Sequence, residues 1–234
     1  MLARTRALVV AVSLGAMDAD AADVERAAPD APAEVKPLPA GLTPAQVFRS
    51  GEELITANSG EATGWSRAAV EAGITRIEKS LAEGFRDRAA VYRALSQGYN
   101  AMWSRYELDA GERARYRRLE AETARKVWEL SNDPQWGMSW AVNLTDGKEN
   151  VAACRAVVAK HPRHAPARLA LAAALCRQGP SADGLRHLLA GLDALRLADI
   201  DLRRSELTSQ GFQCGGGQGF AAVEKAIAAR EKKR

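Results

Sequence analysis

The sequence predicts an all-α protein, and three observations support this. Alanine, arginine and leucine are abundant whereas aromatic residues make up only 6% of the chain, a composition that favours helix over strand. Apolar residues recur at helical spacing in segments such as 165–178 and 181–192. Glycine and proline residues separate these segments at intervals typical of turns between helices.

Each predicted helix follows from local signals. Thr43-Pro44-Ala45-Gln46 is a helix start, with a capping residue, a proline at the first position and a glutamine at the third. The glycine and proline residues after it divide the chain into about ten helices in five pairs. They are expected near residues 43–59, 65–83, 87–105, 110–131, 135–144, 148–160, 165–196 (two helices), 199–211 and 219–232, the last two around a glycine-rich turn.

The clearest pair lies at residues 165–192. Its first stripe is large-small-large and its second is small-large-small, so two antiparallel helices can pack closely. The stripes are Leu171, Ala172 and Leu175, then, after the helix breaker Gly179, Gly184, Leu188 and Gly191.

This segment resembles one tetratricopeptide repeat, and residues 87–131 and 133–162 resemble it in degenerate form. The resemblance implies a right-handed solenoid of antiparallel TPR-like helix pairs. Trp136 stands where the family favours tryptophan. Trp140 stands where the family usually has a small residue, which predicts a splayed pairing or a shifted register there.

The N-terminus predicts an exported protein, periplasmic or secreted. Arg4 and Arg6 precede a short apolar run at 7–17, and Ala19-Asp20-Ala21 fits a signal-peptide cleavage site. We therefore expect a signal peptide over 1–21, a disordered Pro/Ala-rich linker over 22–42 and a helical repeat domain over 43–234. A frayed amphipathic N-terminus in the cytosol is the alternative. No later segment is apolar enough to span a membrane.

Charge and motifs exclude several function classes. With 33 basic and 29 acidic residues, the net charge of +4 describes a mixed surface and not a nucleic-acid binder. No common catalytic or nucleotide-binding motif stands in its required context, so we expect no enzyme and no cofactor. One candidate set of zinc ligands is His161, His164, Cys154 and Cys176. The alternative is that the two histidines lie in an exposed, solvated turn. The expectation is no metal.

The three cysteines allow one disulfide and one buried thiol. Cys176 and Cys214 lie near the ends of successive first helices of pairs, at similar heights, whereas Cys154 lies in the middle of a second helix. If a disulfide forms, it is expected between Cys176 and Cys214. The alternative is that all three are small buried hydrophobic residues.

We expect the chain to bind a protein or peptide as a scaffold or adaptor. In the family it resembles, the first helix of each pair lines the concave face, and this face would show Arg93, Gln97, Asn100, Ala141, Leu144, Leu169, Ala173 and Arg177. Hydrogen bonds to a peptide are assigned to Arg93, Gln97, Asn100 and Arg177. The alternative for each of these residues is an ordinary solvated surface.

A second hypothesis is a small-molecule carrier of a solute transport system. Aromatic residues of segments 92–106 and 128–140 would line its pocket, chiefly Tyr99, Trp103, Trp136 and Trp140. Packing of these side chains in the core is the alternative. A third class is an enzyme accessory or a purely structural module.

Overall fold

The computed structural model describes residues 35–59 and 66–232, and this part of the chain is all-helical, as predicted. No strand occurs among these residues. The nine helices are α1 (Pro44–Ser59), α2 (Arg67–Ala82), α3 (Arg88–Arg105), α4 (Ala110–Ser131), α5 (Pro134–Asn143), α6 (Gly147–Lys160), α7 (Ala165–Cys176), α8 (Ala182–Ala194) and α9 (Leu197–Glu231).

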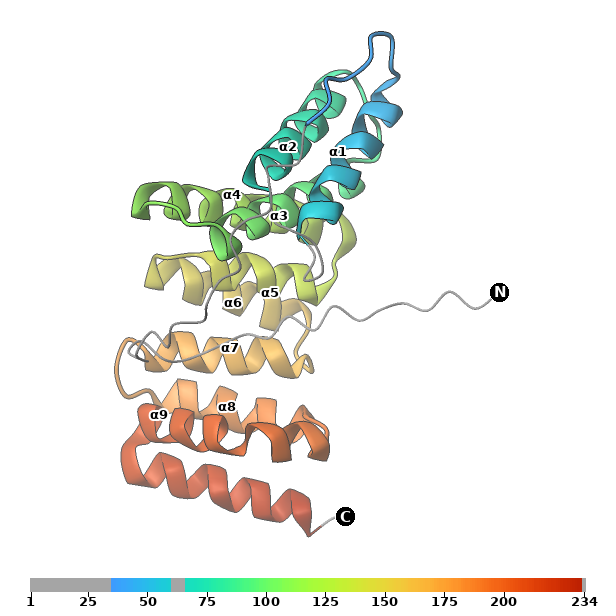
Figure 1. Cartoon of the computed structure of the whole chain (residues 1–234). Helices are drawn as coiled ribbons and strands as arrows, with labels where there is room; N and C mark the ends of the chain where they lie inside the picture. The colour runs from blue at the N-terminus through green and yellow to red at the C-terminus, as the bar shows by residue number, and fades with distance from the viewer. Residues whose placement is uncertain (1–34, 60–65, 233–234) are drawn as a thin grey trace.

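The helices are stacked in chain order. Each helix packs against the next along the chain, and α1 also meets α3, α5 meets α7 and α7 meets α9. Figure 1 shows the result as an elongated stack with α1 and α2 at one end and α9 at the other. One step is missing from this series, because α3 and α5 do not pack directly against each other.

Three clusters of buried side chains form the core. The first joins α1 to α4 and includes Ile55, Val70 and Met102. The second joins α4 to α7, and the third joins α7 to α9. Because α7 belongs to both of the last two clusters, it connects the middle of the stack to its C-terminal end.

Small residues allow the close contact between α7 and α8. Gly184 and Gly191 are both buried in α8, and a Cβ atom built on Gly191 would lie 2.8 Å from Cδ2 of Leu169. Leu171 and Ala172 on α7 are buried too, whereas Leu175 is half-buried. Of the first expected stripe, only Ala172 faces α8, beside Leu169 and Cys176, whereas Leu171 and Leu175 pack in the cluster that joins α4 to α7. The glycine stripe of α8 is therefore confirmed, but the stripe expected to face it on α7 is wrong.

Local signals explain where the helices begin. Before α1, the Thr43 amide donates to Oε1 of Gln46 at 2.9 Å, the expected reciprocal cap. Asp87, Asp109, Asp133, Asp146 and Ser181 cap α3, α4, α5, α6 and α8 by accepting backbone N–H groups. Helix bounds therefore follow the sequence-based ranges closely.

The expected glycine-rich turn lies inside α9. Gly215 and Gly216 have non-helical dihedral angles, and Gly216 has φ +57°, a conformation that favours glycine. The kink divides α9 into two helical segments, which correspond to the last two expected helices. Gly211 and Gly219 then approach so closely that a Cβ atom on Gly219 would overlap the carbonyl oxygen of Gly211.

The expected disulfide joins Cys176 at the end of α7 to Cys214 beside the kink, with their Cα atoms 4.9 Å apart. Cys154 is a buried free thiol in the second core cluster. Burial raises the pKa of this thiol to about 11. Both assignments made from the sequence are therefore confirmed.

Residues 35–42 of the predicted linker contact the first helices. The carbonyl oxygen of Lys36 accepts a hydrogen bond from the Arg76 guanidinium, and Leu38 and Leu42 are half-buried. Residues 35–42 thus lie against the first helices instead of forming a free tether. The predicted signal peptide and residues 22–34 of the linker fall outside the described residues. Within the described ranges, each helix is too short or too polar to cross a membrane.

Candidate functional site

The polar residues predicted to contact a peptide fall into two groups. Arg93, Gln97 and Asn100 are exposed on α3. Arg177 is exposed just beyond α7, a helix that does not pack against α3. The structure therefore brings three of the four together and places Arg177 apart from them.

The predicted groups also differ in how firmly they are held. Nε of Arg93 donates only to the Ala89 carbonyl of its own helix, at 3.2 Å. Arg177 donates to Oδ1 of Asn150 at 3.1 Å, and Asn150 donates to the carbonyl of Ala141 at 2.6 Å. Arg177 thus supports the contact between α5 and α6, besides being exposed.

The apolar part of the predicted face is wrong. Ala141, Leu169 and Ala173 are buried, with exposed fractions of 0%, 2% and 7%, and Leu144 is half-buried. The physical reason is the crowded position of α7, which packs against α5, α6, α8 and α9. Its small side chains let these neighbours close over it, so the open face is confined to other helices.

The four predicted pocket aromatics lie in different surroundings. Tyr99 is buried in the first core cluster, and its hydroxyl donates to Oε1 of Glu78 at 2.8 Å. Burial raises the pKa of this hydroxyl. Trp136 and Trp140 pack against the second core cluster instead. Trp103 belongs to neither cluster and is half-buried.

Trp140 is part of a four-layer stack of side chains. Its ring stacks on Trp128 with the ring centroids 5.2 Å apart. The Arg125 guanidinium lies 5.3 Å from the Trp140 centroid, and the Lys160 ammonium lies 4.2 Å from the Trp128 centroid. Cations over indole faces are attracted by the ring quadrupole. The stack therefore joins α4, α5 and α6.

A polar cluster around Glu120 is the most unusual arrangement in the described chain. Glu120 lies on α4 and is only 3% exposed. Its carboxylate accepts hydrogen bonds from Trp103 Nε1, from Asn100 Nδ2 (3.3 Å to each oxygen) and from the Ser139 hydroxyl (3.3 Å). We call these four residues, with Asn143 beside them, the Glu120 cluster.

The electrostatics of the Glu120 cluster are those of a charge held by neutral donors. Within the described ranges, no lysine or arginine forms an ion pair with Glu120. Burial raises the pKa of this carboxyl group, and the hydrogen bonds from Trp103, Asn100, Ser139 and Asn143 oppose that shift. The guanidinium of Arg117, on the same helix as Glu120, lies over the Trp103 ring, 5.2 Å from the ring centroid.

The Glu120 cluster was missed at the level of sequence, although a signal existed. Glu120 shares the buried stripe of α4 with Ala121, Ala124, Val127 and Trp128. These positions are spaced i, i+1, i+4, i+7 and i+8, the pattern of a core-facing helix side. A carboxylate on such a stripe requires buried hydrogen-bond donors, and the sequence does not say which helix supplies them.

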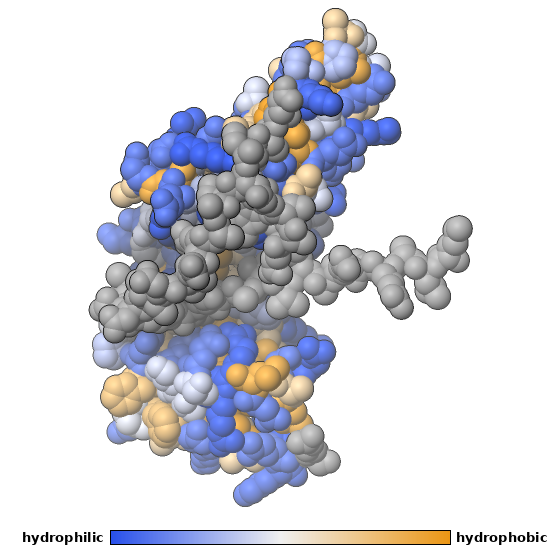
Figure 2. Space-filling view, viewed as in Figure 1, coloured by the Kyte–Doolittle hydropathy of each residue, from blue (hydrophilic) through white to orange (hydrophobic). Residues whose placement is uncertain are grey.

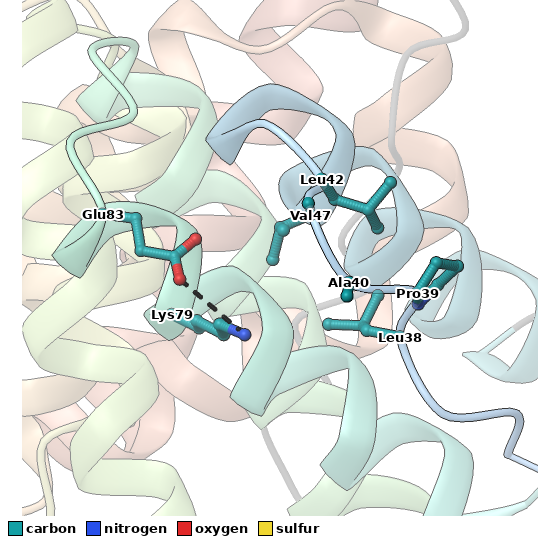
Figure 3. A pocket seen from close by; sticks show the side chains of 8 residues that line it. Leu38, Pro39, Ala40, Leu42, Val47, Lys79 and Glu83 are labelled. Atoms are coloured by element: carbon teal, nitrogen blue, oxygen red, sulfur yellow. Dashed lines mark ion pairs between the residues drawn. The ribbon is translucent and has the colours of Figure 1, made fainter.

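A small pocket of about 230 Å³ lies at the N-terminal end of the stack. Figure 3 shows its walls, formed by the segment Leu38–Leu42 and by α1 and α2, with Lys79 and Glu83 at one side. These two side chains form an ion pair at 3.7 Å. None of the predicted aromatic residues lines this pocket.

The residues weighed for zinc are not arranged as four ligands. Cys176 is bonded to Cys214, and Cys154 is buried in the core. Among the residues that the structure describes, no group of three or more His, Cys, Asp or Glu side chains is placed to hold a metal ion.

Comparison of the chain with protein-family models, with curated proteins and with solved structures finds no match.

Proposed function

We propose that this chain is a scaffold or adaptor that binds a protein or peptide, and that it is built as a right-handed solenoid of antiparallel TPR-like helix pairs. The stack of helices in chain order supports this architecture, since repeat proteins place each unit against its neighbours. The proposed recognition surface lies on α3.

The exposed polar row of α3 is the observation that carries the proposal. Arg93, Gln97 and Asn100 lie at spacings of four and three residues, so they share one side of the helix. Neither Arg93 nor Gln97 has a side-chain partner among the described hydrogen bonds to other helices, so both remain available to bind backbone or carboxylate groups. Figure 2 shows hydrophilic residues over much of the visible surface, with hydrophobic residues scattered among them.

We also propose that the assembly is exported, periplasmic or secreted. The Cys176–Cys214 disulfide supports this location, because such bonds persist in oxidising compartments. The proposed signal peptide over 1–21 is consistent with it. N-terminal sequencing of exported protein should find Ala22 at or near the start, and a retained Met1 would argue against export.

The test compares matched surface variants in affinity purification from the native cell envelope. Arg93→Ala with Gln97→Ala should lose partner capture while the thermal melt stays near wild type, because substitutions at exposed positions usually change stability by about 0.5 kcal/mol or less. Arg118→Ala with Glu122→Ala removes an exposed ion pair on α4 and should leave capture unchanged. Normal capture by the α3 variant would refute the proposed surface.

The second candidate is a small-molecule-binding component of a solute transport system, and Trp103 is the observation that favours it. Its indole is half-buried outside the three core clusters and donates to the Glu120 carboxylate. An aromatic face beside a buried polar group is a common ligand-binding arrangement. Trp103→Phe would then abolish ligand binding, whereas Arg93→Ala with Gln97→Ala would not.

A further inference from the structure

The α3–α5 step is the place where the stack lacks direct packing between first helices. Elsewhere in the series, α1 meets α3, α5 meets α7 and α7 meets α9. Between α3 and α5 the link is made through the Glu120 carboxylate. It accepts from Asn100 and Trp103 on one side and from Ser139 on the other.

We propose that the carboxyl group of Glu120 controls the distance between α3 and α5. When it is protonated the two helices are held close together (the closed step), and when it is ionised they move apart (the loosened step). This inference goes beyond the proposed function, and it does not depend on the identity of any partner.

The geometry supplies the reason why charge matters at this position. A buried carboxylate is costly unless its partners compensate for the lost water. Its donors here are neutral. The hydrogen bonds from Asn100 and Ser139 are long, at 3.3 Å, and only the Trp103 N–H approaches the carboxylate closely. Separation of α3 from α5 would let water reach the carboxylate without disrupting the apolar clusters on either side, because α3 belongs to the first cluster and α5 to the second.

Few charged groups face the carboxyl group. Helix α5 has no ionisable side chain. On α3, Tyr99 points to Glu78, Arg93 is exposed, and Arg105 lies two residues beyond Trp103, on the opposite side of the helix. On α4, Arg117 lies over the Trp103 ring without forming an ion pair with Glu120, and Tyr116, one turn before Glu120, packs against Tyr99. The proton is therefore the main means by which the charge at Glu120 is removed.

The sign of the pH dependence follows from linkage. Burial raises the pKa of Glu120 in the closed step, whereas hydration in a loosened step returns it to the ordinary range. The closed step therefore binds the proton more tightly. Each pKa unit of difference favours closure about tenfold in acid, and this gain is lost as the pH rises through the pKa of the closed step.

The experiment measures the distance between α3 and α5 in the full chain. Spin labels are attached at Gln97→Cys and Gln135→Cys, both exposed, in a Cys154→Ala background that keeps the disulfide. We expect a short, narrow distance distribution near pH 4 and a longer, broader one near pH 8, because burial raises the pKa of Glu120 above its ordinary value.

Two variants distinguish the effect of Glu120 protonation from other effects of acid on the chain. Glu120→Gln cannot ionise and should keep the short distribution at every pH. Glu122→Gln, an exposed site two residues away on the same helix, should respond to pH as the wild type does. An invariant wild-type distance, or a response that persists in Glu120→Gln, would overturn the proposal.

A second readout covers the case in which Glu120→Gln does not fold. The indole N–H of Trp103 is identified in NMR spectra by its loss in Trp103→Phe. In the wild type this signal should shift with a midpoint above the ordinary glutamate pKa, because it donates directly to Glu120. A signal that stays constant with pH, or a midpoint at or below the ordinary value, would also overturn the proposal.

Discussion

Leu171→Ala tests the predicted packing of α7 most directly. Leu171 is 1% exposed and belongs to the core cluster that joins α4 to α7. Removal of a fully buried leucine side chain loses its transfer free energy and leaves a cavity, a combined cost of about 2–5 kcal/mol. For a domain of this size each kcal/mol lowers the melting temperature by about 2–4 °C. The expected decrease is therefore about 4–20 °C.

Leu202→Ala is the matched control, because it deletes the same atoms from a side chain that is 84% exposed. Its free energy of unfolding should stay within about 0.5 kcal/mol of wild type. Leu175→Ala should fall between the two, since Leu175 is half-buried. Urea and thermal unfolding followed by circular dichroism give all three values. Equal melting temperatures for Leu171→Ala and Leu202→Ala would refute the reasoning.

Two further predictions concern the C-terminal end of the stack. Gly219→Ala should lower the free energy of unfolding, measured in urea, by about 1–3 kcal/mol, because its Cβ would overlap the Gly211 carbonyl oxygen. Gly217→Ala should not lower it, because the space around Gly217 is open. Equal effects of the two substitutions would contradict the close approach of Gly211 and Gly219. Reduction of the Cys176–Cys214 disulfide, which closes a loop with a sequence separation of 38, should cost about 4 kcal/mol of stability, and an unchanged urea midpoint would contradict this.

Features that depend on nearby residues were predictable from the sequence. The start of α1 followed from the Thr43 cap, because a cap acts on backbone groups two or three positions away. The glycine-rich turn at 215–216 was predictable for the same reason. The disulfide followed from the heights of Cys176 and Cys214 on helices that stack, which is one step beyond local structure.

Features that depend on a third helix were not predictable. The same helical periodicity describes an open face and a face that another helix covers. The buried residues Ala141, Leu169 and Ala173 were therefore assigned to an exposed concave face. The Glu120 cluster was not predicted for a related reason. Its donors come from α3 and α5, and only the arrangement of all three helices brings Asn100, Trp103 and Ser139 to one carboxylate.

Side-chain size explains why the stack is loose at α3–α5 and tight around α7. Half of the residues of α7 are alanine, so both α5 and α9 can pack directly against it. Helix α5 instead carries bulky Trp140, which stacks on Trp128 of α4, and Trp136, which packs against the same core cluster. Indole rings hold helix axes further apart than alanine does.

The space at this step is spanned by polar groups instead of apolar ones. Apolar contacts resist separation at any pH, whereas a buried carboxylate with neutral donors is held by hydrogen bonds that water can replace. The step beside Asn100 is therefore the part of the described stack whose spacing responds most to protonation. Because Asn100 also belongs to the proposed recognition surface, a change in that spacing would alter the surface that a partner meets.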